Sequence, residues 1–329
     1  MDTRDSIAAV LAAYPLETSR VTPLGSAGGF SGSSFWRVDT PSQAFCLRRW
    51  SAEHPSPERL RFIHDVLRYV YQRAVTQIAL PVRARHGETF IRHRGHLWEM
   101  APWMPGRADY PQNPSPARLQ AALSLLARFH LAAGGFQPRP PSISPGIAER
   151  LELLDSFRQD GAQRIAASIG HPAGNLDRAA RQILQLFTAS APAIRSSLEV
   201  AACWQVPIQP CLRDIWHDHL LFTGDQVSGL IDFGALRYES VAADVARLLG
   251  SLAGSDRAAW RIGMDVYQQA RPLSRNERML VDVFHDSNLL LSGMNWLRWI
   301  YVEKRTFENW QRVFERIDYN LAALRNLHK

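Results

Sequence analysis

The chain has 329 residues, of which 46% are hydrophobic and 10% aromatic, and it carries a formal net charge of +7. This composition is typical of a globular protein and excludes a disordered one, while the lack of an apolar run of about 18 residues excludes a membrane-spanning helix. A basic chain can bind nucleic acid, but these arginines are dispersed and form no clustered tract. A solvated, arginine-rich surface is therefore the favoured explanation, and nucleic acid is not an expected partner.

The N-terminal sequence and the cysteines favour a cytoplasmic protein. The first residues, MDTRDSIAAVLAAYPLE, carry acidic side chains and lack the basic start and apolar core of a secretory signal. Cys46, Cys203 and Cys211 form neither a zinc-site spacing nor a disulfide framework, which favours a reducing compartment. The length is too great for one compact core and suggests two lobes.

The first third of the chain is predicted to be rich in strands. After a short helix over residues 6–13, strands are expected over residues 21–24, 34–39 and 44–49. The loop between the first two of these strands contains Gly25, Gly28, Gly29 and Gly32.

The glycine-rich loop has the features of a flap over nucleotide phosphates. A phosphate loop of the G-x-x-x-x-G-K type would need a lysine, and a dinucleotide-binding loop would need a following helix; neither is present. A flap needs a strand on each side and a cation on the next strand, which Arg48 would supply. A flexible surface hairpin is the alternative.

The rest of the chain alternates between predicted strands and helices before becoming mostly helical. A helix is expected over residues 57–73, with Ser56 as its N-cap, and strands around residues 78–82, 89–92 and 96–100. The segment EMAPWMPGR, from Glu99 to Arg107, is interpreted as a connector, which gives lobes over residues 1–103 and 104–329. Further helices are expected over residues 117–133, 147–157, 176–194, 241–253, 258–270, 274–287, 289–304 and 307–327. The pattern predicts an α+β fold.

One stretch, PCLRDIWHDHLLFTGDQVSGLIDFG from Pro210 to Gly234, places two carboxylates at the ends of a predicted hairpin. Gly224, with polar neighbours between two apolar runs, indicates a tight turn. The hairpin would hold Asp214 before its first strand and Asp232 after its second. One carboxylate could then accept a proton and the other hold a metal ion.

These pieces together resemble the aminoglycoside phosphotransferase and choline kinase group, the small-molecule branch of the protein-kinase-like fold. The resemblance runs from GSAGGFSGSSFWRV through FCLRRW, WEMAPWMPG and LARFH to LRDIWHDHLLF and LIDFG. It implies a bilobal fold with a small β-rich N-lobe for the nucleotide and a larger, mostly helical C-lobe. It also implies transfer of the γ-phosphoryl group of ATP to a hydroxyl group of a small molecule.

The resemblance also implies roles for individual residues. Asp214 matches the catalytic aspartate of the family pattern H-G-D-x-x-x-x-N, and Asp232 matches the magnesium-binding aspartate of DFG. His219 stands at the position of the second metal ligand, and Asp244 matches an aspartate that steadies the catalytic loop. The residues expected to bind the nucleotide are Gly28, Gly29, Ser31, Arg48, Glu99 and Ala101.

The chain departs from the family pattern at four positions, the first of which is Arg48 in place of the usual lysine of the third strand. Leu212 and Arg213 replace the His-Gly of the motif, and His219 replaces its asparagine, although imidazole is a poor ligand for magnesium. A catalytically impaired nucleotide-binding protein of the same fold is therefore an alternative hypothesis. An RNA-binding role, motivated by the basic charge, is a third.

The acceptor is expected to bind at the segment GMNWLRWIYVEKRTFEN. Trp296, Trp299 and Glu303 would share one face of a helix, where an aromatic pair and a carboxylate could hold a cationic or sugar-like molecule. The alternative is that both tryptophans are core residues and Glu303 is exposed. Asp286 and His285 are further candidates.

Overall fold

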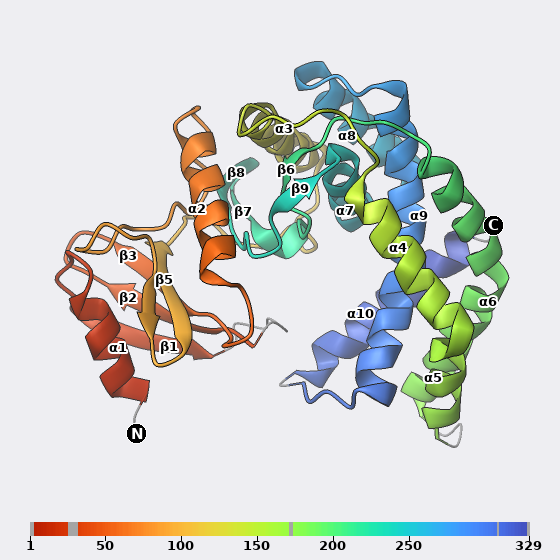
Figure 1. Cartoon of the computed structure of the whole chain (residues 1–329), viewed down its shortest axis with the longest axis horizontal. Coiled ribbons are helices and arrows are strands. Elements are labelled where there is room, and N and C mark those ends of the chain that lie inside the picture. The colour runs from red at the N-terminus through yellow and green to blue at the C-terminus, as the bar shows by residue number, and fades with distance from the viewer. Residues whose placement is uncertain (1–2, 26–31, 171–173, 308, 328–329) are drawn as a thin grey trace. The chain divides into compact units, whose positions relative to one another are not determined.

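The computed structural model describes residues 3–25, 32–170, 174–307 and 309–327 (Figure 1). Its contacts divide the chain into two compact units. Unit 1 comprises Met1–Phe136 and His217–Leu236, and unit 2 comprises Gln137–Trp216 and Arg237–Lys329. The hairpin at residues 217–236 thus belongs with the N-terminal part of the chain, and the lobe boundary after residue 103 stays a prediction.

Unit 1 is built on a five-stranded antiparallel sheet, which confirms the strand-rich N-terminal region. The strand order is β1-β2-β3-β5-β4, so consecutive strands are neighbours except where β5 lies between β3 and β4. The strands are β1 (Arg20–Gly25), β2 (Ser34–Asp39), β3 (Ala44–Arg49), β4 (Ile91–His93) and β5 (His96–Pro102).

The two faces of the sheet have different tasks because side chains alternate along each strand. Phe45 and Leu47 of β3 are buried in a core that includes Val10 of helix α1 (Thr3–Ala12). Arg48 follows Leu47 directly along β3 and therefore belongs to the opposite face. The α1 core holds one side of β3 rigid, and the other side is left to carry a charged group.

Two capped helices complete unit 1. Helix α2 (Pro57–Tyr71) begins with a proline, and Ser56 accepts a hydrogen bond from the N–H of Arg59, as the sequence predicts. Helix α3 (Pro116–Ala133) begins in the same way after Ser115. Both helices bury an apolar stripe, and they pack against each other within unit 1.

The hairpin predicted around Gly224 is present, as β7 (Leu220–Thr223) and β8 (Gln226–Leu230). The prediction of a strand over residues 78–82 is wrong. In its place, Ile78 makes a single parallel bridge to Leu230, and the N–H of Val82 donates to Met100 at 2.7 Å. Pro81 has no N–H to give a ladder, so this segment links the hairpin to the sheet as an irregular connector.

Unit 2 is mostly helical. Its helices are α4 (Pro145–Ser156), α5 (Ala162–Ser168), α6 (Asn175–Ala201), α7 (Val241–Ala253), α8 (Arg257–Ala270), α9 (Arg275–Leu297) and α10 (Trp310–Leu327). Helix α9 contacts α4, α6, α7 and α10 and forms the centre of the unit. Among the described residues, no helix is long and apolar enough to cross a membrane.

The prediction of two helices over residues 274–287 and 289–304 is wrong. Helix α9 continues past Asn288 and is followed directly by a π-helical segment, η3 (Arg298–Val302). The sequence prediction also missed α5 and the two-stranded sheet of β6 (Gln209–Cys211) and β9 (Arg237–Glu239). Three-residue strands are too short to show a period-2 pattern.

Candidate functional site

In unit 1, Arg48 and Asp232 form an ion pair. Nη1 of Arg48 lies 3.0 Å from Oδ1 of Asp232, and Nε donates to the hydroxyl of Ser33 at 3.3 Å. Arg48 comes from β3, and Asp232 follows β8, so the connection of the hairpin to the sheet brings them together. The Arg48 side chain is only 8% exposed, whereas the Asp232 side chain is 41% exposed. Two residues that the sequence assigned to one site therefore touch.

Aromatic rings fix the plane of the Arg48 guanidinium. Its central carbon lies 3.3 Å from the ring centroid of Trp50 and 5.1 Å from that of Phe35. Trp50 is buried and also closes on Gly234, where a Cβ atom would lie 2.9 Å from the indole. Arginine stacks on aromatic faces through its planar guanidinium, which the compact ammonium of lysine does not. The sequence prediction missed Trp50.

Asp232 adopts a backbone conformation that is uncommon for a residue with a side chain. Its φ is +61°, in the left-handed region. The N–H of Ile231 donates to the carbonyl of His219 at 3.1 Å, so the hairpin places His219 beside Asp232, with Nε2 3.9 Å from Oδ2. Strained residues of this kind persist only where their surroundings hold them, and they cluster at functional sites.

The charge state of Asp232 follows from these neighbours. Burial acts to raise its pKa, but the positive charge of Arg48, with help from His219 and a hydrogen bond from Gly234, outweighs it, and the pKa is lowered. The carboxylate is therefore ionised over the working pH range. An ionised oxygen donor is what a hard divalent cation prefers.

Glu99 is held from helix α2 by a histidine. Nε2 of His64 lies 2.7 Å from Oε2 of Glu99, and Nδ1 lies 2.7 Å from the hydroxyl of Thr89. Glu99 is the cross-strand neighbour of Arg48, and Ala101 is that of Cys46. The sequence prediction missed His64. This residue lies on the buried, apolar face of α2, and a polar residue at such a position could have indicated it.

Three predicted nucleotide-binding residues, Gly28, Gly29 and Ser31, lie outside the residues that the structure describes. Their roles stay predictions.

In unit 2, Asp214 contacts Arg247. Oδ1 of Asp214 accepts a hydrogen bond from Nη2 of Arg247, which lies on α7 one turn after Asp244. Two residues after Asp214, the indole of Trp216 stacks on the guanidinium of Arg316 from α10. The central guanidinium carbon lies 3.2 Å from the centroid of the indole ring. The sequence prediction named neither arginine. Both are recognisable only once the helices of unit 2 are assembled.

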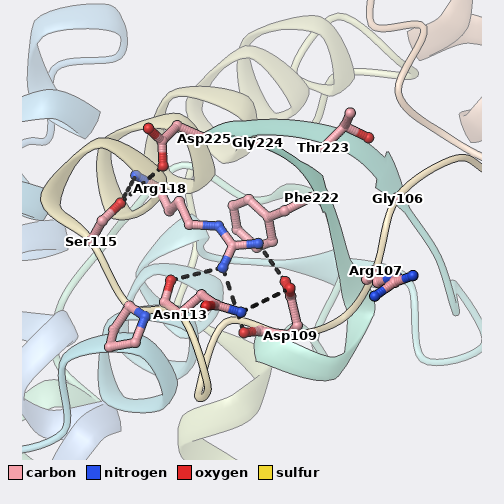
Figure 2. Close-up of a pocket in the computed structure, with 11 residues that line it drawn as sticks. Gly106, Arg107, Asp109, Asn113, Ser115, Arg118, Phe222, Thr223, Gly224 and Asp225 are labelled. Carbon is pink, nitrogen blue, oxygen red and sulfur yellow. Dashed lines mark hydrogen bonds and ion pairs between the residues drawn. The ribbon is translucent and has the colours of Figure 1, made fainter.

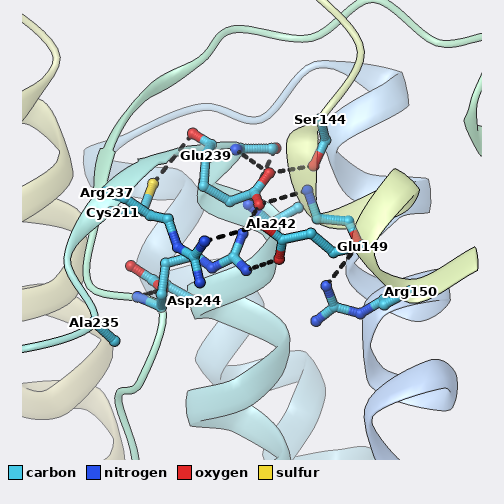
Figure 3. A network of polar contacts seen from close by, with 12 residues as sticks. Ser144, Glu149, Arg150, Cys211, Ala235, Arg237, Glu239, Ala242 and Asp244 are labelled. Carbon is cyan, nitrogen blue, oxygen red and sulfur yellow. Dashed lines mark hydrogen bonds and ion pairs between the residues drawn. The ribbon is translucent and has the colours of Figure 1, made fainter. Parts of the chain in front are cut away.

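Asp244 holds the segment before Asp214. Its Oδ2 accepts the N–H of Leu212 at 2.6 Å, and its Oδ1 accepts the N–H of Arg213 at 2.6 Å (Figure 3). Asp244 is fully buried on α7. A buried carboxylate that accepts two backbone N–H groups fixes the loop, which is the role that the resemblance implied.

The predicted acceptor residues lie together but are already in contact with other groups. The rings of Trp296 and Trp299 are 5.1 Å apart, and Trp296 is buried. The carboxylate of Glu303 pairs with Arg298 at 3.2 Å and with Arg305 at 2.7 Å. The π-helical turn η3 changes the residue spacing between Trp299 and Glu303, so α-helical periodicity does not describe this segment.

A half-buried acidic group lies earlier on α9. Burial, reinforced by Asp282, raises the pKa of Asp286 to about 6 against the opposing charge of Arg257, and burial lowers the pKa of the adjacent His285 to about 4. His285 is thus neutral at neutral pH, with its ring 4.6 Å from that of Trp260.

We expect Asp286→Asn to stabilise the protein at pH 8 but not at pH 4. Because the pKa of Asp286 is raised in the folded state, the free energy of unfolding decreases as pH rises from about 4 to about 6. After allowance for partial exposure, the gain at pH 8 is about 1 kcal/mol. Urea unfolding at both pH values measures it, with the exposed Asp265→Asn on α8 as the charge-matched control. Equal effects of Asp286→Asn at the two pH values would contradict the prediction.

A surface cavity of about 730 Å³ in unit 1 lies between the connector and the β7–β8 turn. Figure 2 shows the guanidinium of Arg118 between Asp109 and Asn113, beside the ring of Phe222. Of the predicted site residues that the structure describes, none lines this cavity. The cluster ties the connector and α3 to the turn end of the hairpin.

The donor set beside Arg48 fits a divalent cation in part. Asp232 offers ionised carboxylate oxygens, which suit magnesium, calcium or manganese. The imidazole of His219 is a nitrogen donor that magnesium disfavours and softer metals accept. The residues are thus compatible with one cation at Asp232.

Comparison with known proteins agrees with this geometry. Residues 22–277 match the family described as "Phosphotransferase enzyme family". A curated homoserine kinase from Gluconobacter oxydans (strain 621H) is 27% identical over 285 residues, which cover 83% of this chain and 81% of the relative.

Solved structures share the fold at low identity. A spectinomycin phosphotransferase with ADP and spectinomycin bound is 11% identical, covers 98% of each chain and has a TM-score of 0.69. An amicoumacin kinase with AMP-PNP and Ca²⁺ bound is 13% identical, with a TM-score of 0.68 over 98% of this chain and 94% of that one. These similarities confirm the predicted kinase-like α+β fold.

Proposed function

The chain belongs to the phosphotransferase enzyme family and is an ATP-dependent kinase that phosphorylates a hydroxyl group of a small molecule, and we propose roles for its residues in that reaction. The observation that supports them best is the contact between Arg48 and Asp232 at 3.0 Å. A buried cation and an ionised carboxylate in contact are the two charges that a triphosphate and its metal require.

Asp214 acts as the general base. Its carboxylate accepts the proton of the acceptor hydroxyl as the oxygen attacks the γ-phosphorus and the bond to the β-phosphate oxygen breaks. Arg247 holds Oδ1 of Asp214 and so orients the carboxylate. Such positioning supplies a large part of the rate enhancement in phosphoryl transfer.

Arg48 binds the phosphates in unit 1, together with the backbone of the loop that contains Gly28, Gly29 and Ser31. The backbone of β5 at Glu99 and Ala101 receives the adenine edge. The His64 contact keeps the Glu99 side chain turned toward α2, so it is not the Glu99 carboxylate that meets the base.

Asp232 holds Mg²⁺, and His219 completes the site through its imidazole or a bound water. When bound, the metal neutralises phosphate charge. Asp232 is already ionised and needs no proton release to bind the cation. The nitrogen of His219 favours manganese as a second competent metal.

The acceptor is an amino acid or amino alcohol that carries a free hydroxyl group. The homoserine kinase similarity supports this class. Trp296 and Trp299 form one wall for the acceptor, with Glu303 at its edge. Because Glu303 already has two arginine partners, it contributes little net negative charge, and a strongly polycationic acceptor is disfavoured.

The proposal is tested by an ATP-consumption screen of hydroxyl compounds, which begins with L-homoserine, aminopropanol and spectinomycin, in Mg²⁺ and Mn²⁺ in parallel. We expect turnover with at least one amino acid or amino alcohol in both metals. Nucleotide-dependent thermal stabilisation without turnover on any compound would instead support the catalytically impaired alternative that His219 motivates.

We expect Trp50→Leu to weaken ATP binding by about 30-fold, because a desolvated cation–π contact contributes about 2 kcal/mol. Trp50→Phe keeps a ring under Arg48 and should change the affinity by less than about 3-fold. Arg48→Lys keeps the charge but loses the stacked plane and should resemble Trp50→Leu. Isothermal titration with ATP measures all three. Wild-type affinity in Trp50→Leu would show that the stack has no part in nucleotide binding.

A further inference from the structure

Arg213 adopts a left-handed backbone conformation immediately before Asp214. Its φ is +67°. Glycine adopts this conformation freely, whereas a residue with a Cβ is strained there by about 1–3 kcal/mol and keeps it only where its surroundings impose it. The conformation of Arg213 therefore requires an explanation from its contacts.

The Arg213 side chain is anchored to two carboxylates of unit 2. Nη1 contacts Oε2 of Glu239 and Nη2 contacts Oε2 of Glu149, while the side chain is only 11% exposed. Figure 3 shows the two glutamates, Glu149 and Glu239. Burial acts to lower the pKa of Arg213, but these carboxylates hold it above its ordinary value. The guanidinium fork is thus fixed at both of its terminal nitrogens.

Glu239 is a rigid anchor because both of its carboxylate oxygens have hydrogen-bond or ion-pair partners. It is fully buried, and its oxygens also accept hydrogen bonds from the hydroxyl of Ser144 and from the N–H groups of Gly146 and Ser240. Gly146 lies at the N-terminus of α4, where negative charge is stabilised by the helix dipole. A Cβ on Gly146 would lie 2.6 Å from Oε2 of Glu239, so this close approach needs glycine.

The same strand that carries Glu239 also fixes the start of the loop. β9 pairs with β6, with Gln209 opposite Glu239 and Cys211 opposite Arg237. The backbone of Arg213 is held by Asp244 and its side chain by Glu239, so the residue is clamped from two directions. Asp214 is the next residue, so the fixed backbone of Arg213 determines the direction in which the chain enters Asp214.

From this geometry we infer that Arg213 is a positioning residue for Asp214, and that the buried Arg213–Glu239 contact holds the loop in the turn that directs the Asp214 carboxylate. The inference rests on the proposed role of Asp214 as the base. It assigns a function to a side chain whose described contacts are with Glu149 and Glu239.

The test compares Arg213→Ala with Arg237→Ala. Arg237 also pairs with Glu149, at 3.0 Å, but its side chain is 48% exposed and it lies outside the loop. Both variants remove one positive charge beside the same carboxylate. We expect Arg213→Ala to lower kcat by about 100-fold with the KM for ATP within about 2-fold, since a displaced catalytic group loses rate rather than nucleotide affinity. Arg237→Ala should keep wild-type kcat.

Hydrogen–deuterium exchange of residues 209–216 provides a measurement that needs no acceptor. We expect exchange in this segment to rise at least 10-fold in Arg213→Ala and to be unchanged in Arg237→Ala. Arg213→Lys, which keeps one carboxylate contact, should recover part of the protection and of kcat, and it serves if the alanine variant does not fold.

The outcomes separate the inference from the proposed function. Unchanged exchange and unchanged kcat in Arg213→Ala would overturn the inference, as would a lower melting temperature with wild-type kcat. If Asp214→Asn, assayed beside it, retained activity, the assignment of the base itself would fail, whatever Arg213→Ala did.

Discussion

Asp214→Asn is expected to lower kcat by about 1,000-fold while leaving the dissociation constant for ATP unchanged. General base catalysis contributes between about 100-fold and 10,000-fold, and an amide cannot accept the proton. The residues proposed to bind the phosphates belong to unit 1, whereas Asp214 and its partner Arg247 belong to unit 2. Loss of the base should therefore leave nucleotide binding intact. Steady-state kinetics and isothermal titration with ATP measure the two quantities.

Asp218→Asn is the matched control for this experiment. Asp218 lies four residues further along the same stretch, and its Oδ1 is 3.4 Å from Nε2 of His217. The variant removes the same charge without touching the proposed base, so kcat should stay within about 3-fold of wild type. If Asp214→Asn retained more than a tenth of wild-type kcat, another group would have to accept the proton.

The architecture of unit 1 was predictable because its signals are local. Alternation over β2 and β3, the Ser56 cap and the glycine turn at Gly224 each depend on residues close in sequence, and the structure contains all of these elements. The strand predicted over residues 78–82 failed for the opposite reason. The segment does have an apolar pattern. However, its hydrogen-bond partners, Leu230 and Met100, are distant in sequence, and the bonds to them do not form a continuous β-ladder.

The resemblance located Asp214 and Asp232 but could not locate the residues that hold them. His64, Arg247 and Glu239 act through contacts with residues far along the chain, and no local motif marks these three residues or Trp50. Glu239 illustrates this best. In sequence it is one acidic residue before α7, and only the pairing of β6 with β9 and the packing of α4 show that it is a buried anchor.

The fold also explains why arginine can replace the expected lysine at position 48 and the expected glycine at position 213. At position 48 the site offers stacked rings, which a planar guanidinium fills and an ammonium does not. At position 213 it offers two carboxylates, which offset the strain of a positive φ. Both departures from the family pattern are thus matched by neighbouring residues, which favours a working enzyme over a degenerate one.

Asp232→Asn is the second change with a large expected effect, and its signature differs from that of Asp214→Asn. The amide keeps the shape of the side chain but removes the charge that attracts a divalent cation, so kcat should fall by about 1,000-fold. The metal-dependent part of ATP affinity should disappear as well. Thermal-shift titrations with ATP, with and without Mg²⁺, measure it: wild type should bind more tightly with the metal, and the variant should bind equally in both conditions.

The same variant tests the coupling between Asp232 and Arg48. Arg48 is almost fully buried, and the ion pair that it forms among the described residues is with Asp232. Without that carboxylate charge, the free energy of unfolding should fall by about 1–2 kcal/mol at pH 7. Because the pKa of Asp232 is lowered in the folded state, the stabilisation is present above about pH 4 and is lost as pH falls through the folded pKa. The stability difference between wild type and Asp232→Asn should therefore shrink in strong acid. A difference that persisted unchanged at pH 2 would mean that the ion pair does not stabilise the free enzyme, and that the contacts with Trp50, Phe35 and Ser33 hold Arg48.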